Sequence, residues 1–356
     1  MLNINYLIKE NHTISVQLPE KLEFGKIFTD HVFEMDYDET GGWHNATIKA
    51  FENLSLSPAT TVFHYGQAVF EGLKAFRMKD GRIGIFRPDI HFQRLNNSCH
   101  KLCIPEVDVD FMLEALKELI KTDRNWVPDK EAQSLYIRPL IIGTDPSLGV
   151  HASGLYKLII MLSPVGAYYP EGFKPVKILA QDEFVRAVRK GLGDCKTPAN
   201  YAASLYAGQD AQKKGFTQVL WLDGVEQKFI EEVGTMNIFI RFKNEIVTPL
   251  LTGSILPGVI RATVLELLRK RGENVTERLV SIDEVVSEYE KGNVLSIFGT
   301  GTAAVISPVS SLTYKDRTMT FNDGQAGKFE VDLFNEISSI QYGLSPDDNN
   351  YISYVD

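Results

Sequence analysis

The chain has 356 residues, more than a single core of ~150 residues normally requires, so its length predicts two domains. Its formal net charge is −9 and no basic cluster offsets that charge, which excludes a nucleic-acid-binding surface. No apolar run reaches the ~18 residues of a membrane span. The N-terminus lacks the features of a signal peptide and carries Glu10 and Glu20, which are unusual in transit peptides. We therefore expect a cytoplasmic protein that acts on small molecules.

The first part of the chain mixes predicted strands and helices. Residues 81–87 (GRIGIFR) alternate as a strand does, and Pro88 then begins a helix that runs to about Leu102. A second helix is predicted over 108–122, where apolar residues recur at helical spacing. Residues 134–143 (SLYIRPLIIG) and 154–165 (GLYKLIIMLSPV) predict two neighbouring strands.

A domain boundary is predicted where the periodic patterns stop. Residues 164–175 (PVGAYYPEGFKP) are rich in proline and glycine and show neither helical nor strand periodicity. We interpret them as a linker between a small N-terminal domain (1–163) and a larger C-terminal domain (176–356).

The second part of the chain predicts an irregular succession of strands and helices. One helix ends at Lys214, with Asn200 as its N-terminal cap and Gly215 just past its end. Two further helices are predicted over 257–271 and around 326–340. The predicted strands are 177–181, 218–224, 236–242, 294–298 and 303–310. Because strands outnumber helices and no regular βαβ series is present, the pattern predicts an α+β fold with mixed sheets.

The cysteines raise the question of a metal site. Cys99 and Cys103 are spaced CxxxC on a predicted helix, with His91 and His100 nearby. Zinc sites usually combine a CxxC pair with a second pair of ligands, and the chain has no second cysteine pair. Buried reduced thiols are therefore the favoured interpretation, and no metal is expected.

A single lysine, Lys196, stands outside regular structure in the segment GDCKTPANY (193–201). A solvated loop lysine is the ordinary interpretation. However, the flanking residues are small and, apart from Asp194, uncharged. Burial disfavours the charged form of an amine, and the neutral amine is the form that makes a Schiff base with an aldehyde. Tyr201 would place a phenol near the same aldehyde.

Other segments offer what a phosphorylated aldehyde cofactor would need. Glu231 and Glu232 lie between two predicted strands, where a buried carboxylate would face a pyridinium N–H; an exposed hairpin turn is the alternative. The helix start at 256–261 (LPGVIR) and the turn at 299–302 (GTGT) present backbone N–H groups to an anion. Arg94, three residues after His91, would add a guanidinium. A plain helix start, a tight turn and a surface arginine remain the alternatives.

One motif points to a different cofactor and fails on its context. Residues 298–304 (FGTGTAA) contain the G-x-G-x-x-A pattern of dinucleotide-binding proteins. That pattern requires a helix directly after the glycines. Here the β-branched segment 303–314 follows and contains Pro308, so we expect a strand and no dinucleotide site. A phosphate-binding loop of the G-x-x-x-x-G-K-[ST] type does not occur in the sequence.

These residues and the motifs around them resemble the branched-chain amino acid aminotransferases, which are pyridoxal-phosphate enzymes of fold type IV. The resemblance extends along nearly the whole chain, and the motifs occur together and in order. They are 24–31 (FGKIFTDH), 63–77 (FHYGQAVFEGLKAFR), 91–95 (HFQRL), 134–140 (SLYIRPL), 193–204 (GDCKTPANYAAS), 231–239 (EEVGTMNIF), 256–261 (LPGVIR), 299–309 (GTGTAAVISPV) and 339–343 (SIQYG).

The resemblance implies a role for individual residues. Lys196 would form the internal aldimine and shuttle the proton, Tyr201 would lie at the ring oxygen, and Glu232 rather than Glu231 would face the pyridine nitrogen. The other implied cofactor contacts are Arg94, Thr235, Val259, Ile260 and Thr302. The implied substrate contacts are Phe70, Tyr136, Arg138, Thr302, Ala303 and Tyr65, the last in the neighbouring subunit's site.

The implied activity is reversible ping-pong transfer of the amino group between L-leucine, L-isoleucine or L-valine and 2-oxoglutarate. The implied fold has a small and a large domain with the cofactor between them, in homodimers or larger assemblies. An apolar pocket of Tyr65, Phe70 and Tyr136 suits branched side chains. The second carboxylate of glutamate would need a cation in that pocket, because an unpaired buried charge is costly. Arg138 is the natural partner, with a structural salt bridge as the alternative.

The sequence departs from the family in two places, and some alternatives stay open. Pro198-Ala199 replace a Gly-Gly pair of many members, so the backbone conformation after Lys196 is not predicted. Ala304 and Ser307 replace the cysteines of a redox-sensing pair in some members, so no such switch is expected. A D-amino-acid aminotransferase, an aminodeoxychorismate lyase and a catalytically silent binding protein remain alternatives. The preferred substrate, the metabolic direction and the choice between dimer and hexamer are not predicted.

Overall fold

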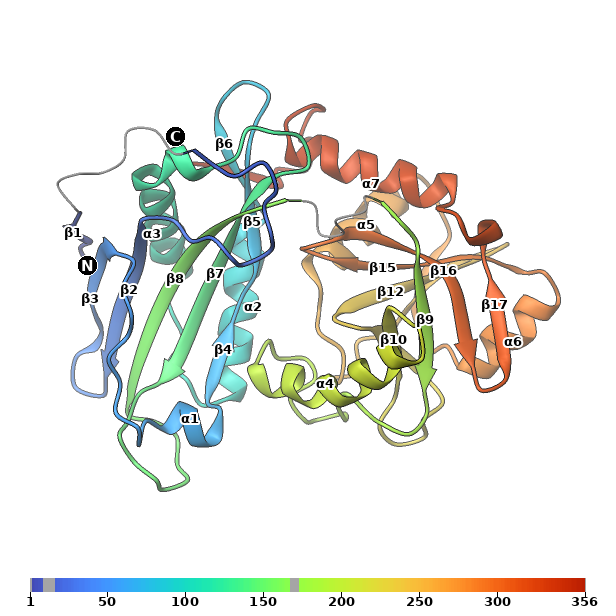
Figure 1. Cartoon of the computed structure of the whole chain (residues 1–356), viewed down its shortest axis with the longest axis horizontal. Helices are drawn as coiled ribbons and strands as arrows, with labels where there is room; N and C mark the ends of the chain where they lie inside the picture. The colour runs from blue at the N-terminus through green and yellow to red at the C-terminus, as the bar shows by residue number, and fades with distance from the viewer. Residues whose placement is uncertain (1, 9–16, 167–172, 356) are drawn as a thin grey trace. The chain divides into compact units, whose positions relative to one another are not determined.

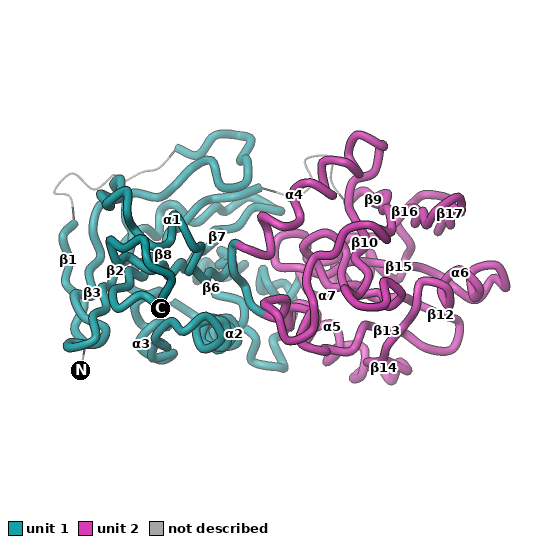
Figure 2. Tube along the Cα trace, turned by 90° about the horizontal axis from the view of Figure 1, so that it is seen from below, with its two compact units in different colours: residues 1–170, 195–198, 339–356 teal, residues 171–194, 199–338 magenta. Residues whose placement is uncertain are grey.

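The computed structural model describes residues 2–8, 17–166 and 173–355, and the chain divides into two compact units (Figure 2). Unit 1 consists of Met1–Pro170, Cys195–Pro198 and Ser339–Asp356, and unit 2 of Glu171–Asp194 and Ala199–Ser338. The division along the chain falls within the predicted 164–175 linker, part of which lies outside the described residues. Two segments of the predicted 176–356 domain, 195–198 and 339–356, group instead with unit 1.

Unit 1 is built on one sheet. Within the described residues, nine strands form it in the order β1-β3-β2-β8-β7-β5-β6-β18, with β4 paired to β7. The strands are β1 (Asn5–Leu7), β2 (His31–Asp38), β3 (Gly42–Ala50), β4 (Ala68–Phe70), β5 (Leu73–Arg77), β6 (Ile83–Phe86), β7 (Ser134–Gly143), β8 (Leu155–Val165) and β18 (Ile352–Tyr354). The helices are α1 (Thr61–Tyr65), α2 (Pro88–Lys101), α3 (Val109–Thr122) and the 3-10 helix η1 (Arg124–Trp126). The strands and helices predicted between residues 81 and 165 are confirmed, and β7 pairs with β8.

The core of unit 1 lies between α2, α3 and one face of this sheet (Figure 1). Phe92 of α2 and Leu116 of α3 are fully buried there against strand residues such as Ile137. The Asp108 carboxylate caps α3 by accepting the Phe111 N–H at 2.8 Å. The opposite face of β5 and β7 is therefore available for polar side chains, since side chains alternate along a strand.

The C-terminal segment joins unit 1 through backbone hydrogen bonds. Strand β18 pairs antiparallel with β6, with Ile352 opposite Phe86. The Lys79 N–H also donates to the Tyr342 carbonyl at 3.0 Å. Sequence patterns do not carry such long-range pairing, which explains why the sequence alone places residues 339–356 in the C-terminal domain.

Unit 2 has a second mixed sheet. In the part of the chain that the structure describes, its order is β11-β10-β9-β16-β15-β12-β13-β14, with β17 paired to β16. Because β11 also pairs with β12, the strands from β11 to β12 close into a ring. The strands are β9 (Val176–Gln181), β10 (Gln218–Leu222), β11 (Ile230–Val233), β12 (Met236–Phe242), β13 (Ile246–Pro249), β14 (Val275–Arg278), β15 (Val294–Gly301), β16 (Val305–Tyr314) and β17 (Arg317–Thr320). The predicted α+β class with mixed sheets is confirmed.

The helices of unit 2 correct one expectation about the segment after Lys196. The helices are α4 (Pro198–Lys213), α5 (Val259–Lys270), α6 (Ile282–Glu290), α7 (Lys328–Gln341) and the 3-10 helix η2 (Asn322–Gly324). Helix α4 begins at Pro198, so the prediction that Asn200 caps it is wrong. A proline needs no hydrogen-bond acceptor at the first helical position. The Asn200 amide instead donates to the Leu192 carbonyl at 2.7 Å.

Most of the GTGT segment (299–302) belongs to a strand, whereas a turn was predicted there. Strand β15 continues through Gly301, and the turn consists of residues 302–304. Strand β16 follows at once, with Val305 opposite Gly301, so the exclusion of a dinucleotide-binding helix is confirmed. No helix among the described residues is both long and apolar enough to cross a membrane.

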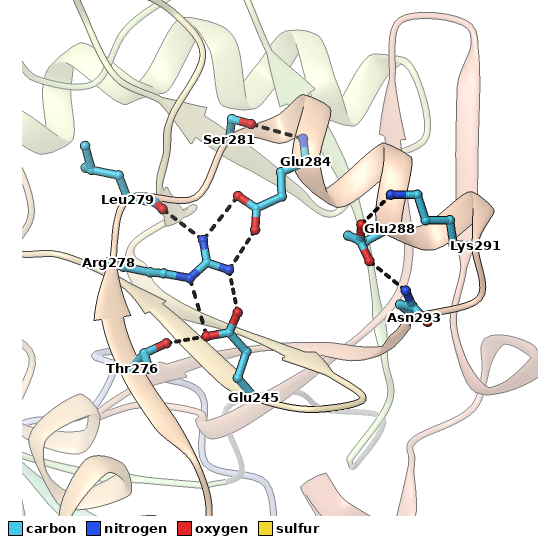
Figure 3. Close-up of polar contacts among 9 residues, drawn as sticks. All are labelled: Glu245, Thr276, Arg278, Leu279, Ser281, Glu284, Glu288, Lys291 and Asn293. Carbon is cyan, nitrogen blue, oxygen red and sulfur yellow. Dashed lines mark hydrogen bonds and ion pairs between the residues drawn. The ribbon is translucent and has the colours of Figure 1, made fainter.

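An ion-pair network joins three elements of unit 2 (Figure 3). The Arg278 guanidinium, at the end of β14, donates to Glu245 Oε1 and to Glu284 Oε1, each at 2.7 Å. Glu245 precedes β13, and Glu284 lies in α6. Hydrogen bonding from Arg278 lowers the pKa of the Glu245 carboxyl. The stabilisation is therefore present above the ordinary pKa of a glutamate and is lost as the pH falls through the lowered value.

Arg278→Met tests this network. We expect a loss of about 1–2 kcal/mol in the free energy of unfolding at neutral pH, because two carboxylates lose a shared, partly screened partner. The difference in the free energy of unfolding between the variant and the unchanged protein should become smaller at acidic pH. Urea denaturation at several pH values measures it, with Arg317→Met as control, since Arg317 forms a more exposed pair with Glu290. Equal losses in the two variants would contradict the idea of a network.

Candidate active site

The backbone of Lys196 is held at both of its polar groups. Its N–H donates to Ser98 Oγ of α2 at 2.9 Å. Its carbonyl accepts the Phe70 N–H of β4 at 2.9 Å. These bonds explain why residues 195–198 belong to unit 1. They also fix the backbone position from which the long lysine side chain extends.

The side chains around Lys196 include two predicted substrate contacts. Lys196 Nζ lies 5.0 Å from the centroid of the Phe70 ring. The guanidinium carbon of Arg138 lies 4.7 Å from the same centroid. Two basic side chains thus approach one aromatic ring, whose negative face attracts positive charge. The structure therefore brings Lys196, Phe70 and Arg138 together within unit 1.

Tyr136 belongs to the same group. Leu135 and Ile137 of β7 face the core, so Tyr136 and Arg138 point to the opposite face of the sheet. The Tyr136 hydroxyl accepts a hydrogen bond from Arg138 Nη2 at 2.9 Å. It lies so close to Gly72 that a Cβ there would be 2.1 Å away. Glycine at position 72 is what leaves room for this phenol.

Arg138 has no carboxylate partner in the part of the chain that the structure describes. Its contacts there are the Tyr136 hydroxyl and the two aromatic rings. Its Nε is buried and makes no hydrogen bond to a described residue. A structural salt bridge, the alternative considered from the sequence, is therefore not what these residues form. The guanidinium is suited to an anionic ligand.

Arg94 is oriented by a carboxylate that the sequence analysis missed. Arg94 Nε and Nη2 donate to Glu71 at 2.7 and 2.8 Å. His91 Nδ1 lies 2.7 Å from Glu71 Oε2 and donates, since a carboxylate only accepts. Burial raises the pKa of Glu71, but the charges of Arg94 and His91 outweigh it and hold the pKa well below its usual range. The alternative of a surface arginine is therefore wrong, because Arg94 is part of a buried ion pair.

Glu232 is a buried carboxylate in unit 2, with only 4% of its surface exposed. Its Oε1 accepts the Leu256 N–H at 2.9 Å and faces the Asn237 amide at 3.4 Å. Its Oε2 lies 3.0 Å from Arg186 Nε. Glu231 is also buried, so the alternative of an exposed acid pair is wrong for both residues.

The start of α5 fits an anion. Gly258 caps the helix without a side-chain bond, and the first helical bond runs from the Ala262 N–H to the Gly258 carbonyl. Among the described residues, no backbone acceptor is hydrogen-bonded to the N–H groups of Val259 and Ile260. A Cβ at Gly258 would lie 1.9 Å from Asn237 Oδ1. These donors and the helix dipole together favour a phosphate.

The remaining predicted residues occupy turns and helix ends. Thr235 is exposed in the β11–β12 turn, and Thr302 and Ala303 are half-buried in the β15–β16 turn. Tyr201 is half-buried in the first turn of α4. Tyr65 ends α1 and is 43% exposed, with its hydroxyl on the Leu148 carbonyl.

Several residues that the sequence analysis did not identify hydrogen-bond to the candidate site residues or form ion pairs with them. They are Ser98, Glu71, Arg186 and Asn237. Lys74 is also buried. Burial lowers the pKa of Lys74 to about 8. Glu71 and Lys74 stand in the apolar run 68–76 (AVFEGLKAF), and a charge within such a run is a usable signal of a buried partner. Nothing local marks Arg186.

The cysteines show no arrangement for a metal. Within the described residues, no group of three or more His, Cys, Asp or Glu side chains is placed to hold an ion. Cys99 and Cys195 are buried, and burial raises the pKa of the Cys99 thiol to about 12. Cys103 is exposed, which corrects the expectation that it is buried. The helix ends at Lys101, before it reaches Cys103.

Comparisons with known proteins agree on one family. The family model described as "Amino-transferase class IV" matches residues 68–312. The chain is 52% identical over 337 residues to branched-chain-amino-acid aminotransferase 2 of Bacillus subtilis (strain 168), covering 95% of this chain and 93% of that protein. It is 51% identical over 332 residues to a probable branched-chain-amino-acid aminotransferase of Staphylococcus aureus (strain N315), covering 93% and 92%.

Solved structures of similar proteins match the fold. The structure of the Escherichia coli branched-chain amino acid aminotransferase superposes with a TM-score of 0.76 at 25% identity, covering 92% of this chain and 100% of that one. A second branched-chain amino acid aminotransferase, solved with pyridoxamine 5'-phosphate, gives a TM-score of 0.77 at 25% identity, covering 93% and 100%.

Glu71→Gln tests the buried ion pair. The variant keeps the shape but leaves Arg94 as a buried cation without this counter-charge, so we expect a loss of about 3–5 kcal/mol in the free energy of unfolding. Because the pKa of Glu71 is lowered in the folded state, the loss should shrink as the pH falls through that value. Urea denaturation measures it. Glu118→Gln, which breaks an exposed pair with Lys121, should cost at most about 1 kcal/mol, and a similar cost for both would contradict the assignment.

Proposed function

The chain belongs to the branched-chain amino acid aminotransferases of class IV, and on this premise we propose that it exchanges amino groups between branched-chain L-amino acids and 2-oxoglutarate. The proposed amino acids are L-leucine, L-isoleucine and L-valine, and the proposed cofactor is pyridoxal 5'-phosphate. One observation carries the proposal beyond the family: Lys196 and Arg138 approach the same Phe70 ring, and Arg138 has no carboxylate partner among the described residues. A reactive amine and an anion-binding cation are the two groups that this reaction needs.

The cofactor contacts predicted from the sequence are part of this proposal. Lys196 would bind it covalently, and Tyr201 and Glu232 would contact its ring oxygen and ring nitrogen. The phosphate would be held by Arg94, Val259, Ile260 and Thr302, with Thr235 beside the cofactor. The N–H groups of Val259 and Ile260, which lack described backbone acceptors, support this assignment. When bound, the cofactor supplies an electron-withdrawing ring that stabilises negative charge at the substrate α-carbon.

Within this proposal Lys196 is also the general base. Its amine would take the proton from the substrate α-carbon and return it to the carbon on the other side of the imine nitrogen, two atoms along the conjugated system. A base must stay at the same point throughout, and the two backbone bonds of Lys196 provide that fixed origin. Glu232 would remain charged and accept the N–H of the ring nitrogen.

The same pocket must accept an apolar and a doubly charged substrate in turn. Phe70 and Tyr136 offer apolar surface to a branched side chain. Arg138 would bind the second carboxylate of glutamate or 2-oxoglutarate, which would otherwise be a buried unpaired charge. The N–H groups of the Thr302-Ala303 turn would receive the α-carboxylate.

We propose a homodimer or larger assembly in which Tyr65 lines the neighbouring subunit's pocket. Phe63, Leu148 and Val150 are 62, 66 and 84% exposed, and Tyr65 touches Leu148. Exposed apolar side chains that form one contiguous patch mark protein interfaces, and these residues would belong to such a patch in the proposed assembly. The cytoplasmic location predicted from the sequence remains part of this proposal.

Lys196→Ala tests the cofactor assignment. We expect the unchanged protein, after incubation with pyridoxal phosphate and dialysis, to be yellow and to change its visible spectrum when L-leucine is added. The variant should lose the covalent band because no amine remains at that position, whereas Lys190→Ala, an exposed lysine nearby, should keep it. An unchanged protein that takes up no cofactor would reject the proposal. Bleaching by D-alanine and not by L-leucine would reject only the substrate.

Arg138→Ala tests the substrate assignment. We expect its half-reaction with glutamate to slow by about 10–100-fold more than its half-reaction with leucine, which corresponds to one charged hydrogen bond. Stopped-flow spectra of the bound cofactor measure both half-reactions. Arg138→Lys, which keeps the charge, should recover part of the glutamate rate. Equal losses for both substrates would contradict the assigned role.

A further inference from the structure

Arg186 forms an ion pair with Glu232 inside unit 2. The two side chains are 7 and 5% exposed, and Arg186 Nε lies 3.0 Å from Glu232 Oε2. The N–H does not point along the line to the oxygen, since Nε counts among the buried atoms without a hydrogen bond. The contact is therefore an ion pair rather than a hydrogen bond. A carboxylate oxygen accepts more than one hydrogen bond, so this ion pair is compatible with a further donor at Glu232.

The guanidinium is itself held rigidly. Arg186 Nη2 donates to the Gly193 carbonyl at 3.1 Å and to the Ser254 carbonyl. A Cβ at Gly193 would lie 2.2 Å from the Ser254 carbonyl oxygen, so only glycine permits these two segments to meet. Arg186 thus joins strand β11, the segment before Lys196 and the segment before α5.

Glu232 is held from its other side as well. The Leu256 N–H and the Asn237 amide occupy Oε1, and the Asn237 amide also donates to the Leu256 carbonyl at 2.8 Å. These two donors are uncharged, so they orient the Glu232 carboxylate without adding a positive charge beside it. Arg186 places a full positive charge directly against this carboxylate. A buried carboxylate that loses such a counter-charge tends to take up a proton.

Other charged groups lie around the neighbouring Glu231. Burial raises the pKa of the Glu231 carboxyl, and Asp223 adds to that effect, while the Ser254 hydroxyl, Arg186 and Arg189 oppose it. Two buried carboxylates therefore stand beside Arg186. Replacement of Arg186 would remove a positive charge from both.

We propose that Arg186 is a positioning residue that keeps Glu232 ionised and thereby keeps the ring nitrogen of the cofactor protonated. The inference rests on the proposed function. Arg186 itself touches no reacting atom in this scheme. If Glu232 is neutral, it no longer favours a positive charge on the ring nitrogen, and the ring withdraws electrons less strongly.

The proposal predicts a spectroscopic effect that a purely structural arginine would not produce. A positive ring nitrogen disfavours a second proton on the nearby linkage to Lys196. In Arg186→Met the pH midpoint of the visible band should therefore rise by about one unit or more. The turnover number should fall by about tenfold or more, with little change in KM for leucine, because a ring that withdraws electrons less strongly stabilises the negative charge at the α-carbon less.

The experiment is a pH titration of holoenzyme spectra for the unchanged protein and for Arg186→Met, Arg186→Lys and Arg189→Met. Arg186→Lys should restore most of the midpoint, and Arg189→Met, an exposed residue in the same segment, should leave it unchanged. The titrations are repeated with the carbocyclic analogue of the cofactor that has no ring nitrogen. With this analogue, the unchanged protein and Arg186→Met should have the same midpoint.

Each outcome has a distinct meaning. A colourless unchanged protein rejects the proposed function and the inference with it. A coloured Arg186→Met with an unshifted midpoint, or a shift that persists with the analogue, rejects only the inference. If Arg186→Met does not fold, Arg186→Gln, which removes the charge but keeps a polar side chain, decides the question: an upward shift that disappears with the analogue supports the role of Arg186, and no shift rejects it.

Discussion

The candidate site depends on the fixed backbone of Lys196. A lysine side chain is flexible and can serve a defined chemical position only if its root does not move. Ser98 holds the N–H and Phe70 holds the carbonyl, each from a different element of unit 1. Pro198 then begins α4 two residues later, which limits the backbone on the other side. A short segment with no regular structure is thus held on both sides of its lysine side chain.

Buried charges follow a common arrangement with opposite signs in the two units. In unit 1 the carboxylate of Glu71 orients the guanidinium of Arg94. In unit 2 the guanidinium of Arg186 is paired with the carboxylate of Glu232. Arg94 and Glu232 are the residues proposed to contact the cofactor, and Glu71 and Arg186, respectively, offset the cost of burying their charges. Arg138 differs from Arg94 and Arg186, because its described contacts are aromatic rings and a phenol. A bound anion would supply the counter-charge that no described carboxylate supplies.

The local parts of this structure could be predicted from the sequence, and the long-range parts could not. Helix α2 begins at Pro88 as predicted, and β7 and β12 have the predicted bounds, because periodicity and proline placement act over short distances. The cap at Asn200 was wrong because Pro198 is an equally good local start signal. The pairing of β18 with β6 depends on contacts between residues far apart in sequence, which no local pattern records.

The same limit applies to the candidate site. Lys196, Arg138 and Glu232 could be named because the motifs around them are specific to a family. Their supporting residues could not, since Ser98, Arg186 and Asn237 act through hydrogen bonds or ion pairs to residues much further along the chain. Chemical types at set spacings are visible in a sequence, whereas the partner that orients each group is a property of the fold.

The burial of Cys195 beside Lys196 provides a built-in reporter of local opening. Cys103 is exposed and would react with a thiol reagent in the native state, whereas Cys99 and Cys195 are buried. A buried thiol becomes reactive only when its surroundings open, so its labelling rate measures the free energy of that opening. The labelling rate of Cys195 would report opening of the segment that carries Lys196. The labelling rate of Cys99 would report opening of α2. Dynamics at this site can therefore be followed by mass spectrometry without introducing any probe.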